Sequence, residues 1–149
     1  MKKVIVIFMV MLMITLVGCS SKEVKEESRV FKGENENWRA EYKSDLKLST
    51  TDKNNITDWK GETKYKLVVT YKKDTASLSK VKKLIIFCET PISSCRHEED
   101  YSESRPLNEK SFVLSGGSSS LNIEKKSDIL KLTITRDDTV EIIDLVLDN

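Results

Sequence analysis

The chain has little of the material that most catalytic sites require. Its 149 residues include one histidine, two prolines and three cysteines. A single histidine leaves little scope for histidine-based acid–base chemistry, and no calcium-loop spacing of the D-x-D-x-D-G kind occurs. An excess of one charge is also missing, because 25 Lys and Arg residues stand against 24 Asp and Glu residues. This balance argues against nucleic acid as a partner, since phosphate binding needs a positive excess.

The chain also lacks an apolar run of comfortable membrane-spanning length. The longest run, Val4–Val17, has about 14 residues and would cover about 21 Å as a helix, short of the ~30 Å hydrocarbon core. Lys2 and Lys3 precede it and small residues follow it. A basic start, a short apolar core and a small-residue end are the three parts of a secretory signal peptide. The alternative, an uncleaved anchor, is disfavoured by the shortness of the run.

The end of this run, Leu16-Val17-Gly18-Cys19, resembles the bacterial lipobox. The resemblance implies cleavage between Gly18 and Cys19 and a diacylglyceryl thioether on the sulfur of Cys19. Residues 1–18 would then be the signal peptide. Residues 19–28 would be the lipidated cysteine and a flexible tether, because they are polar and charged without apolar periodicity. Residues 29–149 would form the folded domain, lipid-anchored on the extracytoplasmic face of the cell membrane.

The domain has the apolar alternation of β-strands. Residues 37–49, 63–73 and 110–117 alternate with period two, and residues 128–149 predict a hairpin with Asp137 and Asp138 in its turn. Residues 81–89 hold a continuous apolar run, which predicts a strand buried on both sides or bulged, and residues 121–126 predict a short further strand. The pattern therefore predicts an all-β fold, an antiparallel immunoglobulin-like β-sandwich, with a small open barrel as the alternative. Its core is expected from the shared period of six side chains: Trp38, Tyr42, Leu67, Val69, Leu132 and Ile134.

The segment "FKGENENWRAEY" after the tether resembles the small surface lipoproteins of Bacillus-type Gram-positive bacteria. The matching positions are Phe31, Gly33, Glu34, Asn35, Glu36, Asn37, Trp38, Glu41 and Tyr42. The C-terminal hairpin of that family is matched at Glu141 and Ile143, but this chain has Arg136 where Trp is usual and no glycine in the turn. The resemblance implies a β-sandwich on the outer face of the membrane and no particular activity.

Two of the three cysteines fall in the domain, where Cys88 and Cys95 flank "ETPISS". Export would place them in a compartment that permits disulfides, and the proline and serines between them favour a turn. The sequence therefore predicts a Cys88–Cys95 disulfide. Two free thiols, or a metal site that adds His97, remain alternatives, although C-x6-C-x-H is not a usual zinc spacing.

Two further features are candidate sites. The run His97-Glu98-Glu99-Asp100 could bind a divalent cation or take part in acid–base chemistry, but a solvated charged loop is the simpler interpretation. Trp59 stands between Asn54-Asn55 and Gly61, outside any alternating stretch, and is either an exposed binding residue on a loop or a cap on the edge of the core. The Ser-rich patch at 115–120 contains neither G-x-S-x-G nor S-x-x-K.

Three classes of function remain. The first is a lipid-anchored, non-catalytic binding or structural module for a protein or an envelope polymer, without cofactor or metal. The second is an enzyme of the cell envelope, or a metal-binding protein, that uses the 97–100 loop; no convergent catalytic set supports it. The third is a transporter's solute-binding lipoprotein, which the short chain disfavours because those proteins have two lobes. The first class fits the composition best.

Overall fold

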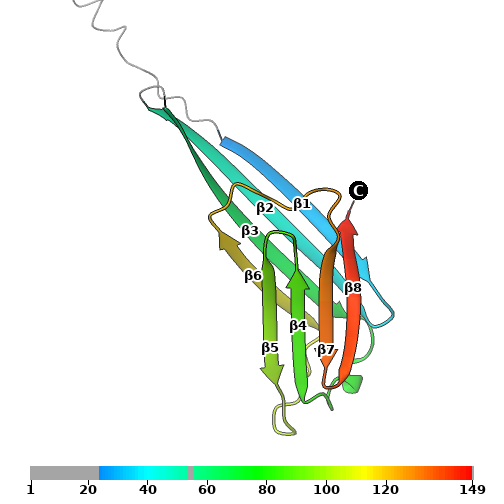
Figure 1. Cartoon of the computed structure of the whole chain (residues 1–149). Coiled ribbons are helices and arrows are strands. Elements are labelled where there is room, and N and C mark those ends of the chain that lie inside the picture. The colour runs from blue at the N-terminus through cyan, green and yellow to red at the C-terminus, as the bar shows by residue number, and fades with distance from the viewer. Residues whose placement is uncertain (1–23, 54–55, 149) are drawn as a thin grey trace, which may run out of the picture.

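The computed structural model describes residues 24–53 and 56–148. Within these ranges the chain forms eight strands and one short 3-10 helix (Figure 1). The elements are β1 (Val24–Glu34), β2 (Trp38–Lys53), β3 (Ile56–Tyr71), η1 (Thr75–Ser77), β4 (Lys83–Glu89), β5 (Ser94–Asp100), β6 (Ser111–Ser118), β7 (Leu130–Arg136) and β8 (Thr139–Leu147). No helix in the described ranges has the length and apolarity needed to cross a membrane.

The strands form two packed layers that belong to one continuous sheet. Their order is β5-β4-β7-β8-β1-β2-β3-β6, and every neighbouring pair is antiparallel. The front layer of Figure 1 holds β5, β4, β7 and β8, and the layer behind it holds β1, β2, β3 and β6. The layers join where Phe31 and Lys32 of β1 pair with Leu147 and Val146 of β8. This architecture confirms the predicted all-β antiparallel sandwich.

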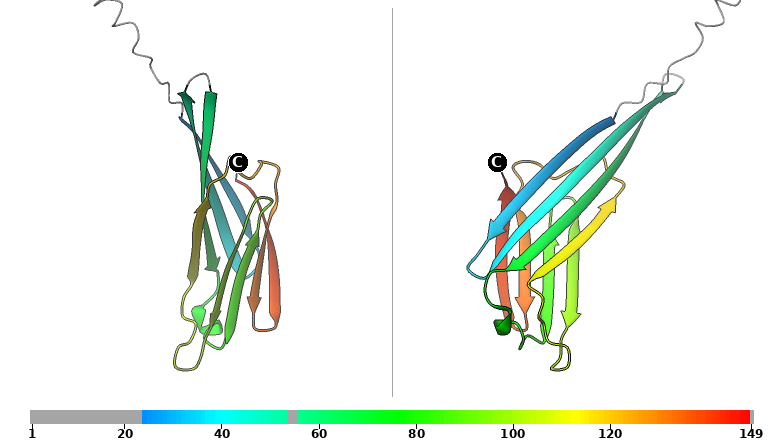
Figure 2. Two further views of the ribbon diagram at one scale, coloured as in Figure 1. Left: turned by 60° about the vertical axis from the view of Figure 1, so that its left-hand side comes forward. Right: turned by 180° about the vertical axis from the view of Figure 1, so that it is seen from behind.

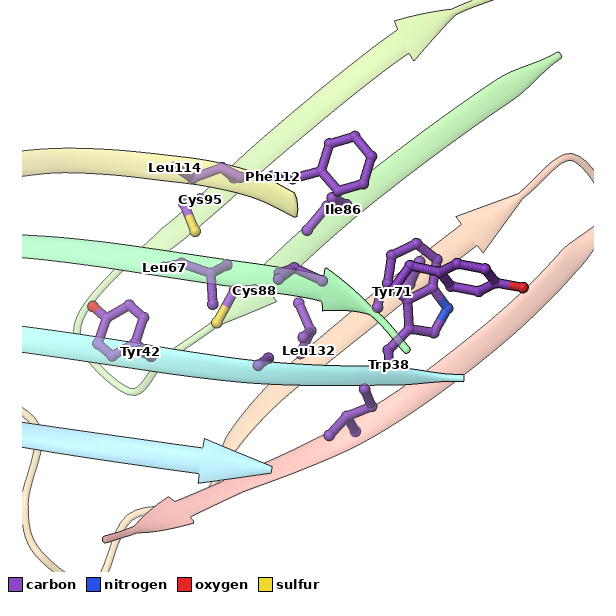
Figure 3. Close-up of a cluster of buried hydrophobic side chains, with 14 of the residues drawn as sticks. Trp38, Tyr42, Leu67, Tyr71, Ile86, Cys88, Cys95, Phe112, Leu114 and Leu132 are labelled. Carbon is purple, nitrogen blue, oxygen red and sulfur yellow. The ribbon is translucent and has the colours of Figure 1, made fainter. Parts of the chain in front are cut away.

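The core lies between the two layers and is built from alternate residues of each strand. All six side chains expected there are buried: Trp38, Tyr42, Leu67, Val69, Leu132 and Ile134. Phe31, Ile86 and Phe112 join them, and the Trp38 ring stands 4.8 Å from that of Tyr71 (Figure 3). Period two therefore identified the inward faces correctly, since a strand can bury only one set of alternate residues on a given side.

The C-terminal hairpin forms as its sequence predicts. Asp137 and Asp138 separate β7 from β8, and Asp137 adopts a φ of 51°, a conformation that Asp tolerates better than most residues. The carboxylate of Asp137 accepts hydrogen bonds from the backbone N–H groups of Lys82 (3.0 Å) and Lys83 (2.9 Å). The turn residue therefore also fixes the start of β4.

The boundaries of the domain differ from those expected. Strand β1 begins at Val24, so residues 24–28, expected in the tether, pair with β2 from Val24–Ser49 onward. The reason is that β2 is long enough to pair with residues 24–28. Backbone hydrogen bonds to β2 can form whatever the side chains are, so this polar segment becomes a strand without apolar alternation. The signal peptide, Gly18, Cys19 and the rest of the tether lie outside the described residues. The strand expected at 121–126 is wrong, because this segment belongs to the β6–β7 loop.

Strands β2 and β3 extend beyond the sandwich as a two-stranded ribbon. Val24 is paired with Ser49, which is paired with Lys60. Beyond this level, β2 and β3 pair with each other and with no third strand among the described residues. We call the ribbon formed by residues 50–53 and 56–59 the arm. Figure 1 shows it projecting past the end of the sandwich, next to the start of β1, and Figure 2 shows the same from two further sides.

Candidate functional site

The outer face of the β5-β4-β7-β8 layer carries an apolar surface. Its residues fall in two cross-strand rows given by the pairing: Phe87, Thr133 and Ile142 in one, and Ile85, Thr135 and Val140 in the other. We call these six residues the outer strip. Ile142 is 57% exposed and Val140 58%, whereas the four others are half-buried. Exposed β-branched residues side by side on a sheet favour contact with another surface.

The outer strip corrects one expectation. The run Leu84–Phe87 was expected to be buried on both sides, or bulged. Strand β4 is regular, its Leu84 and Ile86 are buried, and Ile85 and Phe87 lie on the outer face with no further layer over them among the described residues. Strand β8 behaves in the same way, since Ile143 and Leu145 are buried and Ile142 is exposed. In this protein, a continuous apolar run therefore marks a strand that has one side in the core and an apolar side on the outer face.

Charged residues form a rim beside the outer strip. On the β5 side, Glu98 forms ion pairs with Lys83 (2.6 Å) and with Arg96 (2.6 Å). These two cations hold the pKa of Glu98 at about 2, with Lys83 the larger influence. At the next row along the strands stand Glu89, Lys131 and Asp144. The rim therefore offers both signs of charge at neutral pH, a common arrangement around an apolar interface.

Cys88 and Cys95 lie directly opposite each other on β4 and β5 and are both buried, between the layers (Figure 3). Both are free thiols in the structure. Hydrogen bonding to Cys95, together with burial, raises the pKa of the Cys88 thiol. The turn that joins the two strands brings the thiols together, as the sequence reasoning expected, and the disulfide itself stays a prediction.

The acidic run after Cys95 is not a loop. Residues 97–100 belong to β5, so His97 and Glu99 point to the inner side of the sheet while Glu98 and Asp100 point outward. Glu99 is paired with Arg105 and accepts a hydrogen bond from the hydroxyl of Tyr101 (2.9 Å). The four side chains therefore do not converge. No group of three or more His, Cys, Asp or Glu residues in 24–53 and 56–148 is placed to hold a metal ion.

Trp59 is part of strand β3 in the arm and not of a loop. Its partner across the ribbon is Thr50, and the Trp59 side chain is 55% exposed. The interpretation of Trp59 as a cap on the edge of the core is therefore wrong, because the arm extends past the opposite layer. Beside it, Leu121 of the β6–β7 loop lies against Gly61, where an added Cβ would come 3.0 Å from a Leu121 methyl. The arm thus presents an exposed aromatic ring close to an exposed aliphatic side chain.

The β6–β7 loop places a carboxylate in the core, which sequence reasoning missed. Glu124 is 1% exposed, and one of its oxygens accepts a hydrogen bond from the hydroxyl of Tyr42 (2.9 Å). Burial raises the pKa of Tyr42, and the negative charge of Glu124 raises it further. Tyr42 stacks on Tyr65 with ring centroids 5.8 Å apart. The only sequence signal was Glu124 within the apolar-flanked stretch "LNIEKK", which did not distinguish a buried carboxylate from an exposed one.

The segment Asn35–Trp38 forms a second polar network, around Glu141 of β8. Both oxygens of Glu141 are filled: one accepts from Trp38 Nε1 (3.1 Å) and Arg136 (2.6 Å), and the other from the side-chain amides of Asn35 (3.0 Å) and Asn37 (2.8 Å). Asn35 also accepts hydrogen bonds from the backbone N–H groups of Asn37 and Trp38. The "ENENW" motif therefore closes the β1–β2 turn and fastens it to β8, which is a structural role.

An open hollow lies on the other layer, over the outer face of β1, β2 and β3. It measures about 720 Å³ and is lined by Lys32, Gly33, Glu34, Arg39, Ala40, Glu41, Val68 and Thr70. Its charges are largely neutralised, since Lys32 is paired with Glu41 (3.6 Å) and Asp148 (2.6 Å). Five of its eight lining residues are charged or polar, so this surface is a poorer candidate for an apolar contact than the outer strip.

Comparison with known proteins does not narrow the choice. The chain matches no protein-family model, no curated protein and no solved structure.

Proposed function

We propose that this chain is a lipid-anchored, extracytoplasmic binding module without catalytic activity, which docks a protein partner on the outer strip. The observation that carries the proposal is the pair of apolar rows on the β5-β4-β7-β8 layer, with Val140 and Ile142 more than half exposed. Anchoring is supported by the lipobox Leu16–Cys19 and its position after a short apolar run.

A protein is the partner that best fits this surface. The strip is mainly apolar, with Thr133 and Thr135 between its apolar side chains, and its rim carries paired charges of both signs. This arrangement matches the apolar core and polar rim of protein interfaces. A sugar polymer would be better served by exposed aromatic rings, and Phe87 of the strip is half-buried. A polyanionic envelope polymer would need a positive excess, which the balanced composition lacks.

The proposal is tested by photo-crosslinking in intact cells, with the full chain as bait and Ile142→Lys as the variant. Val113→Lys is the matched control, because Val113 is equally exposed but lies on β6 of the other layer. We expect one crosslinked protein that Ile142→Lys loses and Val113→Lys retains. A set of crosslinks that is the same for all three chains would contradict docking at the outer strip. A tagged fatty acid should label the chain and not Cys19→Ala, and equal label in both would contradict the anchor.

A further inference from the structure

We propose that the arm contacts the surface of the lipid bilayer, with the indole ring of Trp59 seated among the headgroups. This inference rests on the proposed lipid anchor at Cys19. It assigns Trp59 a lipid partner and leaves the outer strip free for the protein partner, because the two surfaces belong to different layers and different ends of the molecule (Figures 1 and 2).

The length of the chain between the anchor and the fold limits where Trp59 can be. Five residue steps separate Cys19 from Val24, the first described residue, so they span at most about 17 Å. Val24 is level with Ser49 and Lys60, and Trp59 is the next residue of β3 beyond that level. Trp59 is two strands away from Val24, which places their backbones about 10 Å apart. An acylated Cys19 would therefore keep the arm near the membrane.

The side chains at and beside the arm are apolar and exposed, as a contact with the membrane requires. Trp59 and Leu121 are both more than half exposed, and Leu121 lies against Gly61 on the strand that carries Trp59. Val24, at the start of β1, is 46% exposed and lies level with Lys60, the residue after Trp59.

Tryptophan favours the boundary between lipid and water, because its large ring is apolar while its N–H remains free to donate to headgroups or water. Of the two tryptophans, only Trp59 has this freedom, since Trp38 is fully buried and donates to Glu141. A covalent lipid anchor holds the protein at the bilayer and so raises the effective concentration of Trp59 there. A side chain with weak affinity for the bilayer can therefore remain bound to it.

The test uses the acylated full-length mature protein, purified from a bacterial host and reconstituted in phosphatidylcholine–phosphatidylglycerol vesicles. Half of the samples contain phosphatidylcholine brominated near the glycerol end of its chains, because bromine quenches only indole rings that touch it. We expect wild-type emission to fall by up to about half on brominated vesicles, since one of its two tryptophans is at the surface. Trp59→Phe is the matched control, and its remaining Trp38 should be unaffected by bromine.

Two outcomes would count against the inference, and they are distinguishable. Equal emission on plain and brominated vesicles, from a protein that sediments with them and carries the acyl mass, would overturn the bilayer contact alone. Trp59 would then face water and remain available to a protein or a glycan. A mature protein without acyl mass would overturn the proposed anchor, and the bilayer contact with it.

Discussion

Replacing Glu141 by glutamine should be among the most destabilising conservative changes in this protein. The Glu141 carboxylate is nearly buried and accepts four hydrogen bonds, two at each oxygen, from Asn35, Asn37, Trp38 and Arg136. In Glu141→Gln an NH2 group replaces one oxygen, so two donors face another donor whichever way the amide turns. Arg136, itself mostly buried, also loses its counter-ion.

The magnitude follows from these losses. Two hydrogen-bond donors left unsatisfied, either Trp38 and Arg136 or Asn35 and Asn37, cost about 2–4 kcal/mol of the free energy of unfolding. The cost falls toward the lower end of the 3–5 kcal/mol typical of breaking a fully buried ion pair, because Arg136 keeps some contact with water. Arg136 also lies 5.9 Å from the centroid of the Trp38 ring and retains that cation–π contact.

The effect should depend on pH. Burial raises the pKa of Glu141, but the hydrogen bonds from Asn37, Trp38 and Arg136 outweigh it and leave the pKa below its ordinary value of 4.5. A carboxylate with a lowered pKa in the folded state stabilises the fold above the unfolded-state pKa and loses this contribution as pH falls through the folded-state pKa. The difference between wild type and Glu141→Gln should therefore be full near pH 7 and shrink below about pH 4.5.

Urea unfolding followed by tryptophan fluorescence measures both quantities. Glu62→Gln is the control, because Glu62 is an exposed strand residue in a surface ion pair with Lys64, and its loss should cost less than about 0.5 kcal/mol. The reasoning would be refuted if Glu141→Gln shifted the urea midpoint no more than Glu62→Gln does. It would also be refuted if the difference from wild type stayed constant from neutral pH to pH 3.

Two further predictions concern the core. Leu132→Ala removes a fully buried side chain and should cost about 2–5 kcal/mol in a calorimetric melt, whereas the exposed Lys131→Ala should be nearly neutral; an unchanged melting temperature would show that Leu132 is not part of the core. Cys88 and Cys95, as directly opposed partners, should be oxidised to a disulfide in the exported protein. The intact mass should then be about 2 Da lower than that of the dithiol, with two alkyl groups added only after reduction, and alkylation without reductant would exclude the bond.

The sequence by itself determined the strands that have one solvent-exposed face and one buried face. Residues 38–49 and 63–71 alternate and lie within β2 and β3, and residues 130–147 form the hairpin of β7 and β8, each with the expected side inward. Alternation is a local property that any half-buried strand must satisfy, so it can be read without knowing the partner strand. The Asp137-Asp138 turn was readable for the same reason, because its backbone requirement is met by the two residues themselves.

The tertiary structure alone decided the features that depend on a neighbour. The charged run 97–100 is a strand because β4 offers it hydrogen-bond partners, and the exposed side of Leu84–Phe87 depends on which layer lies opposite. Glu124 is buried because its loop crosses the end of the core to reach Tyr42. Trp59 is exposed because the opposite layer ends before the arm does. Burial is set by what packs against a residue, and these packing partners are far away in the sequence.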